Sequence, residues 1–241
     1  IEVIMALLGR GADINARGED QYTPLHMACV KGNIEVIMAL LDRGADINAR
    51  GKYQYTPLYM ACEYDRKIEV IMALLDRGAD INARNINQWT PLQLACYKGN
   101  IEVIMALLDR GADIHARGEY QNTPLYMACM YNGNIEVIMA LLDRGADINA
   151  RNKYQSTPLH RACMDNRKEV IMALLDRGAD INARNKYQKK PYDYIENSST
   201  KSLFDQFVDA MGPVGTNSAL RDLLMNRMPK IHSDETVPWN K

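Results

Sequence analysis

The chain has 241 residues, of which 47% are hydrophobic and 24% are charged, and its formal net charge is −1 at pH 7. This balance excludes a nucleic-acid binder held by a large basic field, and no run of like charges exceeds two residues. The sequence also lacks an apolar run long enough to cross a bilayer and lacks a signal-peptide pattern, so we expect no membrane insertion.

A repeated stretch dominates the sequence from its first residue. The letters IEVIMALLDRGADINAR return almost unchanged, and a Thr-Pro-Leu triplet separates the copies, beginning at Thr23, Thr56, Thr90, Thr123 and Thr157. A period of 33 or 34 residues is typical of one supersecondary unit stacked on itself. Each unit then buries its apolar face only against its neighbours, and function lies on an extended surface.

Each Thr-Pro-Leu triplet predicts the start of a short first helix. In the unit 51–84, Thr56 can cap the helix, and Pro57 suits the first helical position because it has no amide hydrogen to leave unpaired. Leu58, Ala61 and Cys62 then form a narrow apolar stripe with two small residues, where another helix can approach closely.

A longer second helix follows in the same unit. Ile68, Ile71, Leu74 and Leu75 recur at helical spacing, and Gly78 stands where a left-handed C-cap is needed. The residues after this glycine, 79–89, lack helical periodicity and predict an extended loop that leads into the next unit.

Two motifs in fixed phase identify a family resemblance. TPLHMA at 23–28, TPLHRA at 157–162 and the GADINA that ends each second helix resemble the ankyrin repeat over about residues 1–195. The resemblance implies an all-α solenoid of helix-turn-helix repeats with β-hairpin loops. It also implies that the hairpins and first helices line a concave groove, where such domains bind their partners.

The repeat phase sets the expected boundaries. Residues 1–17 are a partial repeat without its first helix, which suggests that the chain continues a longer array. Five full units follow, here called units one to five, and then a degenerate capping repeat and a C-terminal helix with a polar tail. Their ranges are 18–50, 51–84, 85–117, 118–151, 152–184, 185–212 and 213–241.

Departures from the pattern predict local irregularity. Gln stands at the hairpin tip, at 21, 54, 88, 121, 155 and 188, and because Gln tolerates positive φ poorly we expect tips of unusual shape. Units two and four gain one residue between their helices, and unit five reads Asn166-Arg167-Lys168 there. We expect these connections to be the least regular part of the stack.

Positions that vary between units predict the binding surface. All thirteen tyrosines lie in hairpins, first helices or the cap, and none lies on a repeated second helix. Aromatic side chains are enriched in binding hot spots, so we interpret these rings as a solvent-facing protein-binding groove. The predicted protein-binding residues are Tyr53, Tyr55, Tyr59, Tyr64, Trp89, Tyr97, Tyr120, Tyr126, Tyr131 and Tyr154. Alternatively, the regular column at 53, 120, 154 and 187 reflects duplication, with each ring packed on its neighbour.

Other repeated residues suggest structural roles. A row of arginines at 17, 50, 84, 117, 151 and 184 either prefers acidic ligands or, as we favour, pairs with the Asp of each GAD. His26 and His160 match the histidine with which the resembled family holds the turn backbone. The five cysteines recur once per unit and read as buried apolar residues in a reducing compartment, so we predict no metal site and no cofactor.

The sequence shows no nucleophile motif, phosphate loop or zinc-protease motif, so we predict no catalytic activity. The favoured interpretation is a monomeric, cytoplasmic module that binds a protein or peptide and no nucleic acid. Near-identical repeats resemble host-directed arrays of intracellular microbes and viruses, which would place it in the host cytoplasm. The alternatives are a targeting or regulatory arm of a larger enzyme and a structural spacer.

Overall fold

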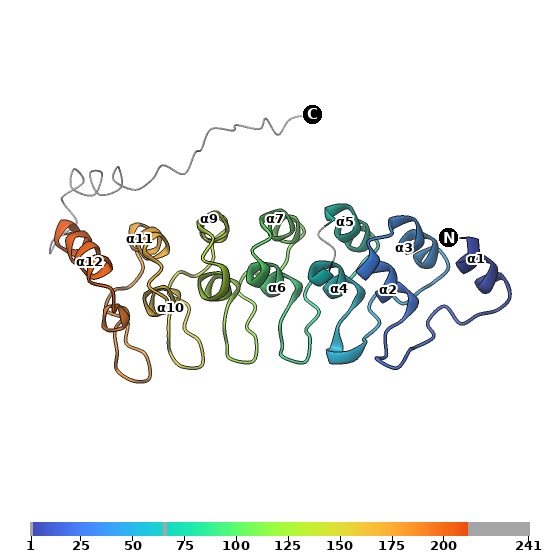
Figure 1. Cartoon of the computed structure of the whole chain (residues 1–241), viewed down its shortest axis with the longest axis horizontal. Coiled ribbons are helices and arrows are strands. Elements are labelled where there is room, and N and C mark those ends of the chain that lie inside the picture. The colour runs from blue at the N-terminus through green and yellow to red at the C-terminus, as the bar shows by residue number, and fades with distance from the viewer. Residues whose placement is uncertain (1, 65–66, 212–241) are drawn as a thin grey trace, which may run out of the picture.

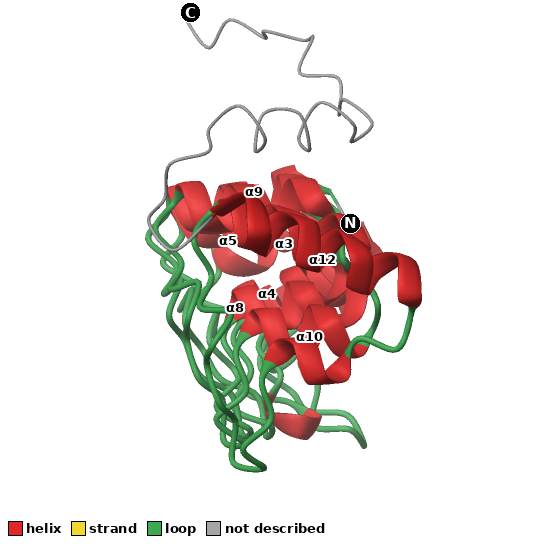
Figure 2. Cartoon of the chain, turned by 90° about the vertical axis from the view of Figure 1, so that its left-hand side faces the viewer, coloured by secondary structure: helices red, strands yellow, loops and turns green. Residues whose placement is uncertain are grey.

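The computed structural model describes residues 2–64 and 67–211, which form a row of stacked helical pairs (Figure 1). Two layers of helices run along the row, and one loop per unit projects from the same edge (Figure 2). Within the described ranges every regular element is a helix, so the predicted all-α solenoid is confirmed. None of these helices combines the length and apolarity that crossing a bilayer requires.

The first helices form one layer and the second helices form the other. The first helices are α2 (Pro24–Lys31), α4 (Pro57–Tyr64), α6 (Pro91–Lys98), α8 (Pro124–Met127) and α10 (Pro158–Met164). The second helices are α1 (Glu2–Gly9), α3 (Ile34–Leu41), α5 (Ile68–Asp76), α7 (Ile101–Asp109), α9 (Ile135–Asp143) and α11 (Lys168–Asp176). The cap contributes the short helix η3 (Pro191–Tyr194) and α12 (Ser198–Met211).

The Thr-Pro pair starts each first helix as the sequence predicts. In unit three, Thr90 Oγ1 accepts a bond from the Gln93 amide at 3.3 Å, and Gln93 Oε1 accepts one from the Thr90 amide at 3.0 Å. This reciprocal capping box satisfies two amides that a helix start would otherwise leave unpaired. The first helix can therefore remain as short as two turns.

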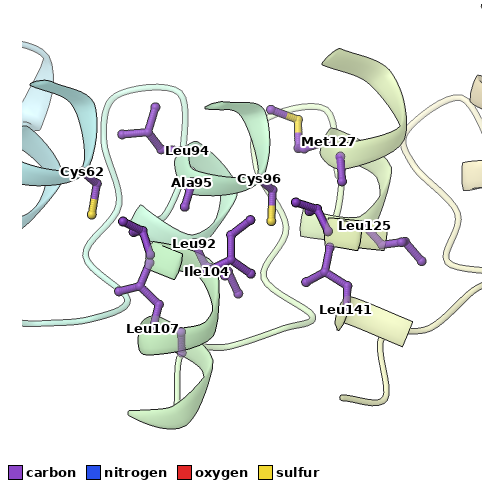
Figure 3. Packing of buried hydrophobic residues seen from close by; sticks show 14 of the residues in the cluster. Cys62, Leu92, Leu94, Ala95, Cys96, Ile104, Leu107, Leu125, Met127 and Leu141 are labelled. Carbon is purple, nitrogen blue, oxygen red and sulfur yellow. The ribbon is translucent and has the colours of Figure 1, made fainter. Parts of the chain in front are cut away.

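A continuous core runs between the two layers. Figure 3 shows Leu92, Ile104 and Leu107 of unit three in one cluster with Cys96, and Leu125 lies on the first helix of the neighbouring unit four. All five side chains are fully buried. Burying one such leucine or isoleucine stabilises the fold by about 1.5–3 kcal/mol, and part of the surface that covers it comes from the neighbouring unit in a stack of this kind.

The projecting loops are closed by tight turns without a strand ladder in the described ranges. In unit two, where the tip forms the short helix η1 (Lys52–Gln54), the Gly51 amide donates to Tyr55 O at 2.9 Å and the Gln54 amide to Gly51 O at 3.0 Å. One backbone bond joins successive loops, from the Lys52 amide to Asp20 O at 2.8 Å. The loops are therefore held in register mainly by bonds at their tips and bases.

The tip glutamines adopt the left-handed conformation that the sequence led us to doubt. Their φ values lie between 58° and 62° at Gln21, Gln54, Gln88, Gln121, Gln155 and Gln188. Left-handed backbone costs a residue with a Cβ about 1–2 kcal/mol. The loop-closing bond from each glutamine amide to the residue three positions earlier offsets this cost, so Gln does accept positive φ at these tips. The expectation that the tips differ in shape from those of the resembled family stays a prediction.

Asparagine side chains join the units along the row. The Oδ1 atom of Asn48 accepts a bond from the Asp80 amide at 2.8 Å, and Asn15, Asn82 and Asn149 bond the corresponding Asp amide of the next unit in the same way. His115 occupies this position in unit three. We call this series of bonds between units the Asn ladder, and a histidine replaces the asparagine at one of its positions.

The connections between helices are irregular where the length varies, as predicted. In unit four the first helix continues into a π-helical turn, η2 (Ala128–Asn132), which absorbs the extra residue before Gly133 at φ 62°. In unit five Asn166 takes a φ of 50° where units one and three have glycine. The corresponding inserted residues of unit two, 65–66, lie outside the described ranges.

The cap closes one end of the core with an amphipathic helix. Phe204, Phe207 and Ala210 of α12 are buried, whereas Asp205, Gln206 and Asp209 are exposed. A terminal repeat needs such a polar outer face. The helix and tail predicted for 213–241 lie outside the described residues.

Candidate functional site

The loops and the first helices border a common surface, which we call the hairpin face. In Figure 2 the loops extend from beneath the layer that contains α4, α8 and α10, away from the second helices. The predicted site residues sit on these loops and helices, because the variable positions of each unit fall there. Their side chains, however, do not all point to solvent.

Tyr59 and Tyr126 are buried, so the expectation that their rings face solvent is wrong. Their exposed fractions are 3% and 6%, and burial raises the pKa of Tyr126 to about 12 and that of Tyr59 still further. Both follow Thr-Pro-Leu, at the position where units one and five have a histidine directed into the contact with the next unit. A ring at this position packs between units rather than on the hairpin face.

The hydroxyl of Tyr59 is satisfied within the stack. Asn85 Nδ2 donates to Tyr59 Oη at 2.9 Å, and Asn85 Oδ1 accepts from the amides of Asn87 and Trp89. In other units His26 Nε2 contacts Tyr55 O at 3.0 Å, and Gln93 Nε2 donates to Asn122 O at 2.8 Å. Sequence reasoning missed Asn85, although the presence of either glycine or asparagine at the loop start was a visible signal.

Two more predicted residues flank this buried ring. Tyr55 stacks on Tyr59 with ring centroids 4.4 Å apart, and Tyr53 lies 5.8 Å from Tyr55. Tyr55 is half-buried, and burial raises its pKa, whereas Tyr53 is 53% exposed. The three rings therefore form a column in which the exposed fraction increases from the core to the loop tip.

A second cluster joins units three and four. Trp89 lies 5.7 Å from Tyr97 and 6.5 Å from Tyr131, and the two tyrosines meet edge to face at 4.4 Å. Tyr131 is 41% exposed, and Tyr64 of unit two is 58% exposed. The structure thus brings Trp89, Tyr97 and Tyr131 together, with Tyr131 displayed at the surface.

A third group lines a pocket between unit four, unit five and the cap. Tyr120 and Tyr154 lie 6.5 Å apart with nearly parallel rings, at an interplanar angle of 18°. This contact supports the duplication alternative for these two tyrosines, because each ring has its neighbour as a partner. Tyr120 is nevertheless exposed and Tyr154 is half-buried, so both retain accessible surface.

The arginine row joins neighbouring loops through their backbone. Arg50 Nη1 donates to Arg84 O at 2.6 Å, and Arg84 Nη1 donates to Arg117 O at 2.6 Å. The same bond recurs from Arg17, Arg117 and Arg151 to the next arginine. The favoured pairing with the Asp of each GAD is therefore wrong, because the guanidinium reaches the carbonyl of the next unit instead.

Histidine and cysteine are structural in this arrangement. His26 Nδ1 lies 2.9 Å from Thr23 Oγ1, and burial lowers its pKa below the ordinary value of 6.5. Burial raises the pKa of Cys62, Cys129 and Cys163 to about 12, which makes them poor nucleophiles. Across the described residues, no three His, Cys, Asp or Glu side chains gather into a cluster that could hold a metal ion.

Comparisons with known proteins agree with the geometry. The family model described as "Ankyrin repeats (3 copies)" matches residues 1–85, 50–118, 82–152 and 116–185. A similar solved structure is the ankyrin repeat domain of Bcl-3, a unique member of the IkappaB protein family, with a TM-score of 0.75 and 27% sequence identity. The match covers 85% of this chain and 91% of that one. The search of curated proteins finds no match.

Proposed function

Because the chain belongs to the ankyrin repeat family, whose repeats are protein–protein interaction modules, we propose that its hairpin face binds one protein partner through exposed aromatic side chains. The observation that carries this proposal is the exposure of Tyr53, Tyr64 and Tyr131 on one face of neighbouring units, at 53%, 58% and 41%. Large rings displayed together on a rigid scaffold are typical of binding surfaces.

The scaffold holds these rings with little conformational freedom. Tyr131 rests against Tyr97 and Trp89, and Tyr53 rests against Tyr55. A partner that binds these rings loses little of their rotamer entropy, because contacts within the stack already restrict them. A row of three units is long enough to support an interface of about 1,200–2,000 Å².

The proposed setting is the reducing cytoplasm, and the proposed role is binding without catalysis by a monomeric chain. Five buried thiols support the first point, and the structural roles of His26 and Cys62 support the second. Near-identical units support a host-directed array, in which case the host cytoplasm is the site of action. As a regulatory arm of a larger enzyme, the same face would bind the catalytic part or its substrate.

The test compares partner capture by two variants that carry the same number of alanines. The first variant combines Tyr53→Ala, Tyr64→Ala and Tyr131→Ala, all at exposed positions of the hairpin face. The control combines Glu69→Ala, Glu102→Ala and Glu136→Ala, which are exposed on the second helices. Tyr59 and Tyr126 are unsuitable, because their removal would test stability rather than binding.

The immobilised chain captures proteins from the lysate of a candidate host, and quantitative mass spectrometry measures what is retained. We expect the aromatic variant to retain about tenfold less of the enriched partner, which corresponds to about 1.4 kcal/mol. The glutamate control retains it at the level of the original chain. Equal retention by both variants, with unchanged circular dichroism, would reject the aromatic hairpin face as the binding surface.

A further inference from the structure

A pocket of about 390 Å³ lies at the junction of unit four, unit five and the cap, and its lining does not include Tyr53, Tyr64 or Tyr131. Five of the eleven residues that line it are tyrosines, and Asn122, Asn152 and Ser156 add polar groups. The tyrosines that line it are Tyr120, Tyr126, Tyr154, Tyr187 and Tyr194. Met130 and Met164 complete the apolar lining, and Met164 is exposed to solvent. Such a lining suits an apolar side chain from a ligand rather than a polar one.

Lysine ammonium groups stand over four of the tyrosine rings that line this pocket. Lys186 Nζ lies 4.3 Å from the Tyr154 ring centroid and 5.1 Å from that of Tyr187. Lys153 Nζ lies 5.8 Å from the Tyr120 centroid, and Lys189 Nζ lies 5.2 Å from that of Tyr194. All three lysines are exposed. Because the ammonium groups rest on ring faces, they keep free hydrogen-bond donors for a ligand.

The local charge balance at the mouth is positive. The one charged residue in the lining, Arg161, is neutralised by Asp165 through two bonds, of 3.0 and 2.6 Å. Among the described ion pairs, none involves Lys153, Lys186 or Lys189. Three unneutralised ammonium groups around an apolar pocket attract carboxylates and orient them toward the rim.

We propose that this pocket binds an acidic peptide segment of the partner protein, with an apolar or aromatic side chain inserted beside Met164 and flanking carboxylates on Lys153 and Lys186. The inference rests on the proposed protein-binding function and names the chemistry of the partner. A single-stranded nucleic acid fits less well, because its bases would have to displace the lysines from the tyrosine faces before stacking on them.

The test selects ligands without assuming a sequence. Short random peptides displayed on phage are selected against the full chain, and the affinity of enriched peptides is measured by fluorescence anisotropy. We expect enriched peptides to combine Asp or Glu with a Trp, Phe, Leu or Met. Oligothymidine of similar length is measured beside them.

Two matched charge-reversal variants locate the binding site. Lys153→Glu with Lys186→Glu alters the pocket mouth, whereas Lys31→Glu with Lys168→Glu reverses two exposed lysines elsewhere in the stack. We expect the first pair to weaken peptide binding about tenfold or more and the second to leave it within about twofold. Met164→Asp, at an exposed position, is expected to weaken binding similarly, and thermal unfolding verifies that each variant folds.

Four outcomes would overturn the inference: selection of basic or uncharged peptides, affinity that the pocket variants do not change, oligothymidine binding that the lysine variant abolishes, or no enriched peptide at all. These outcomes are distinct from failure of the proposed function. Peptides that lose affinity with Tyr53→Ala, Tyr64→Ala and Tyr131→Ala but not with the pocket variants would refute the pocket while supporting the hairpin face.

Discussion

Asn85 Nδ2 donates a hydrogen bond to Tyr59 Oη across the boundary between units two and three, at 2.9 Å, and both residues are buried. The first residue of the next unit differs according to which residue follows Thr-Pro-Leu. A unit with Tyr there is followed by a unit that starts with Asn, as at Tyr126 and Asn152. Units one and three, with His26 and Gln93, are followed instead by a glycine, Gly51 or Gly118. Unit five, with His160, is followed by Asn185, whose Nδ2 donates to Tyr194 Oη of the cap.

Removing the Tyr59 hydroxyl should destabilise the stack more than removing that of Tyr126. In Tyr59→Phe, the buried Asn85 amide loses the acceptor of its bond, which costs about 1–2 kcal/mol of unfolding free energy. In Tyr126→Phe, Asn152 Nδ2 keeps its 3.0 Å bond to Asn122 Oδ1, so the cost should be below about 1 kcal/mol. Urea unfolding of both variants measures the difference, and equal costs would contradict the account.

The repeated letters were enough to predict the stacked helix pairs, because burial requires the same apolar spacing in every unit. The expectation that the rings of the loops and first helices face solvent is correct for Tyr53, Tyr64 and Tyr131. Tyr59 did not follow, since variability alone does not distinguish a surface position from a contact between units. The histidine that the resembled family has at that position was the signal that indicated a buried side chain.

The bonds between loops could not be predicted from one unit. Arg50 and Arg84 are one period apart, and whether the guanidinium reaches an aspartate or the next carbonyl depends on the rise between neighbouring loops. That rise is set by core packing, which the local sequence pattern does not specify. The lysines over the pocket tyrosines, such as Lys186, were missed for the same reason.

His115→Asn should stabilise the chain by extending the Asn ladder. Asn48, Asn82 and Asn149 each accept a bond from the Asp amide of the next unit, and Asp147 is the equivalent residue after His115. An added bond of this kind contributes about 0.5–1.5 kcal/mol to the free energy of unfolding. The reverse change, Asn82→His, should cost a similar amount, and chemical denaturation of both variants tests the pair.

Gly133→Ala should destabilise the chain more than Gly145→Ala. Both glycines have positive φ, 62° and 87°, so each substitution costs about 1–2 kcal/mol of backbone strain. A Cβ on Gly133 would in addition lie 2.1 Å from Arg167 Nη1, whereas nothing lies within 4 Å of one on Gly145. Thermal unfolding should therefore show a lower midpoint for Gly133→Ala, and equal midpoints would mean that Arg167 moves aside at little cost.

Stability should decrease as the pH falls below about 6.5. Burial lowers the pKa of His26 and His160 in the folded chain, so the unfolded chain binds protons first as the pH drops through 6.5. Above that pH the histidine rings are neutral in both the folded and the unfolded chain, so their contribution to stability no longer changes with pH. Gln93 already makes the equivalent bond to the loop carbonyl in unit three. Replacing both histidines by Gln should therefore reduce the change in the urea midpoint between pH 7.5 and 5.5 relative to the original chain.

Thiol labelling should show that the stack opens from its ends. Cys96 lies in the middle unit and Cys29 and Cys163 lie in the outer full units, and all three are fully buried. In a stack of nearest-neighbour interfaces, an outer unit opens by breaking fewer interfaces than a central one, so its thiol becomes accessible more often. We therefore expect a thiol reagent at neutral pH to modify Cys29 and Cys163 before Cys96, as followed by peptide mass spectrometry. Simultaneous modification of all five cysteines would instead indicate that the whole array unfolds as one cooperative unit.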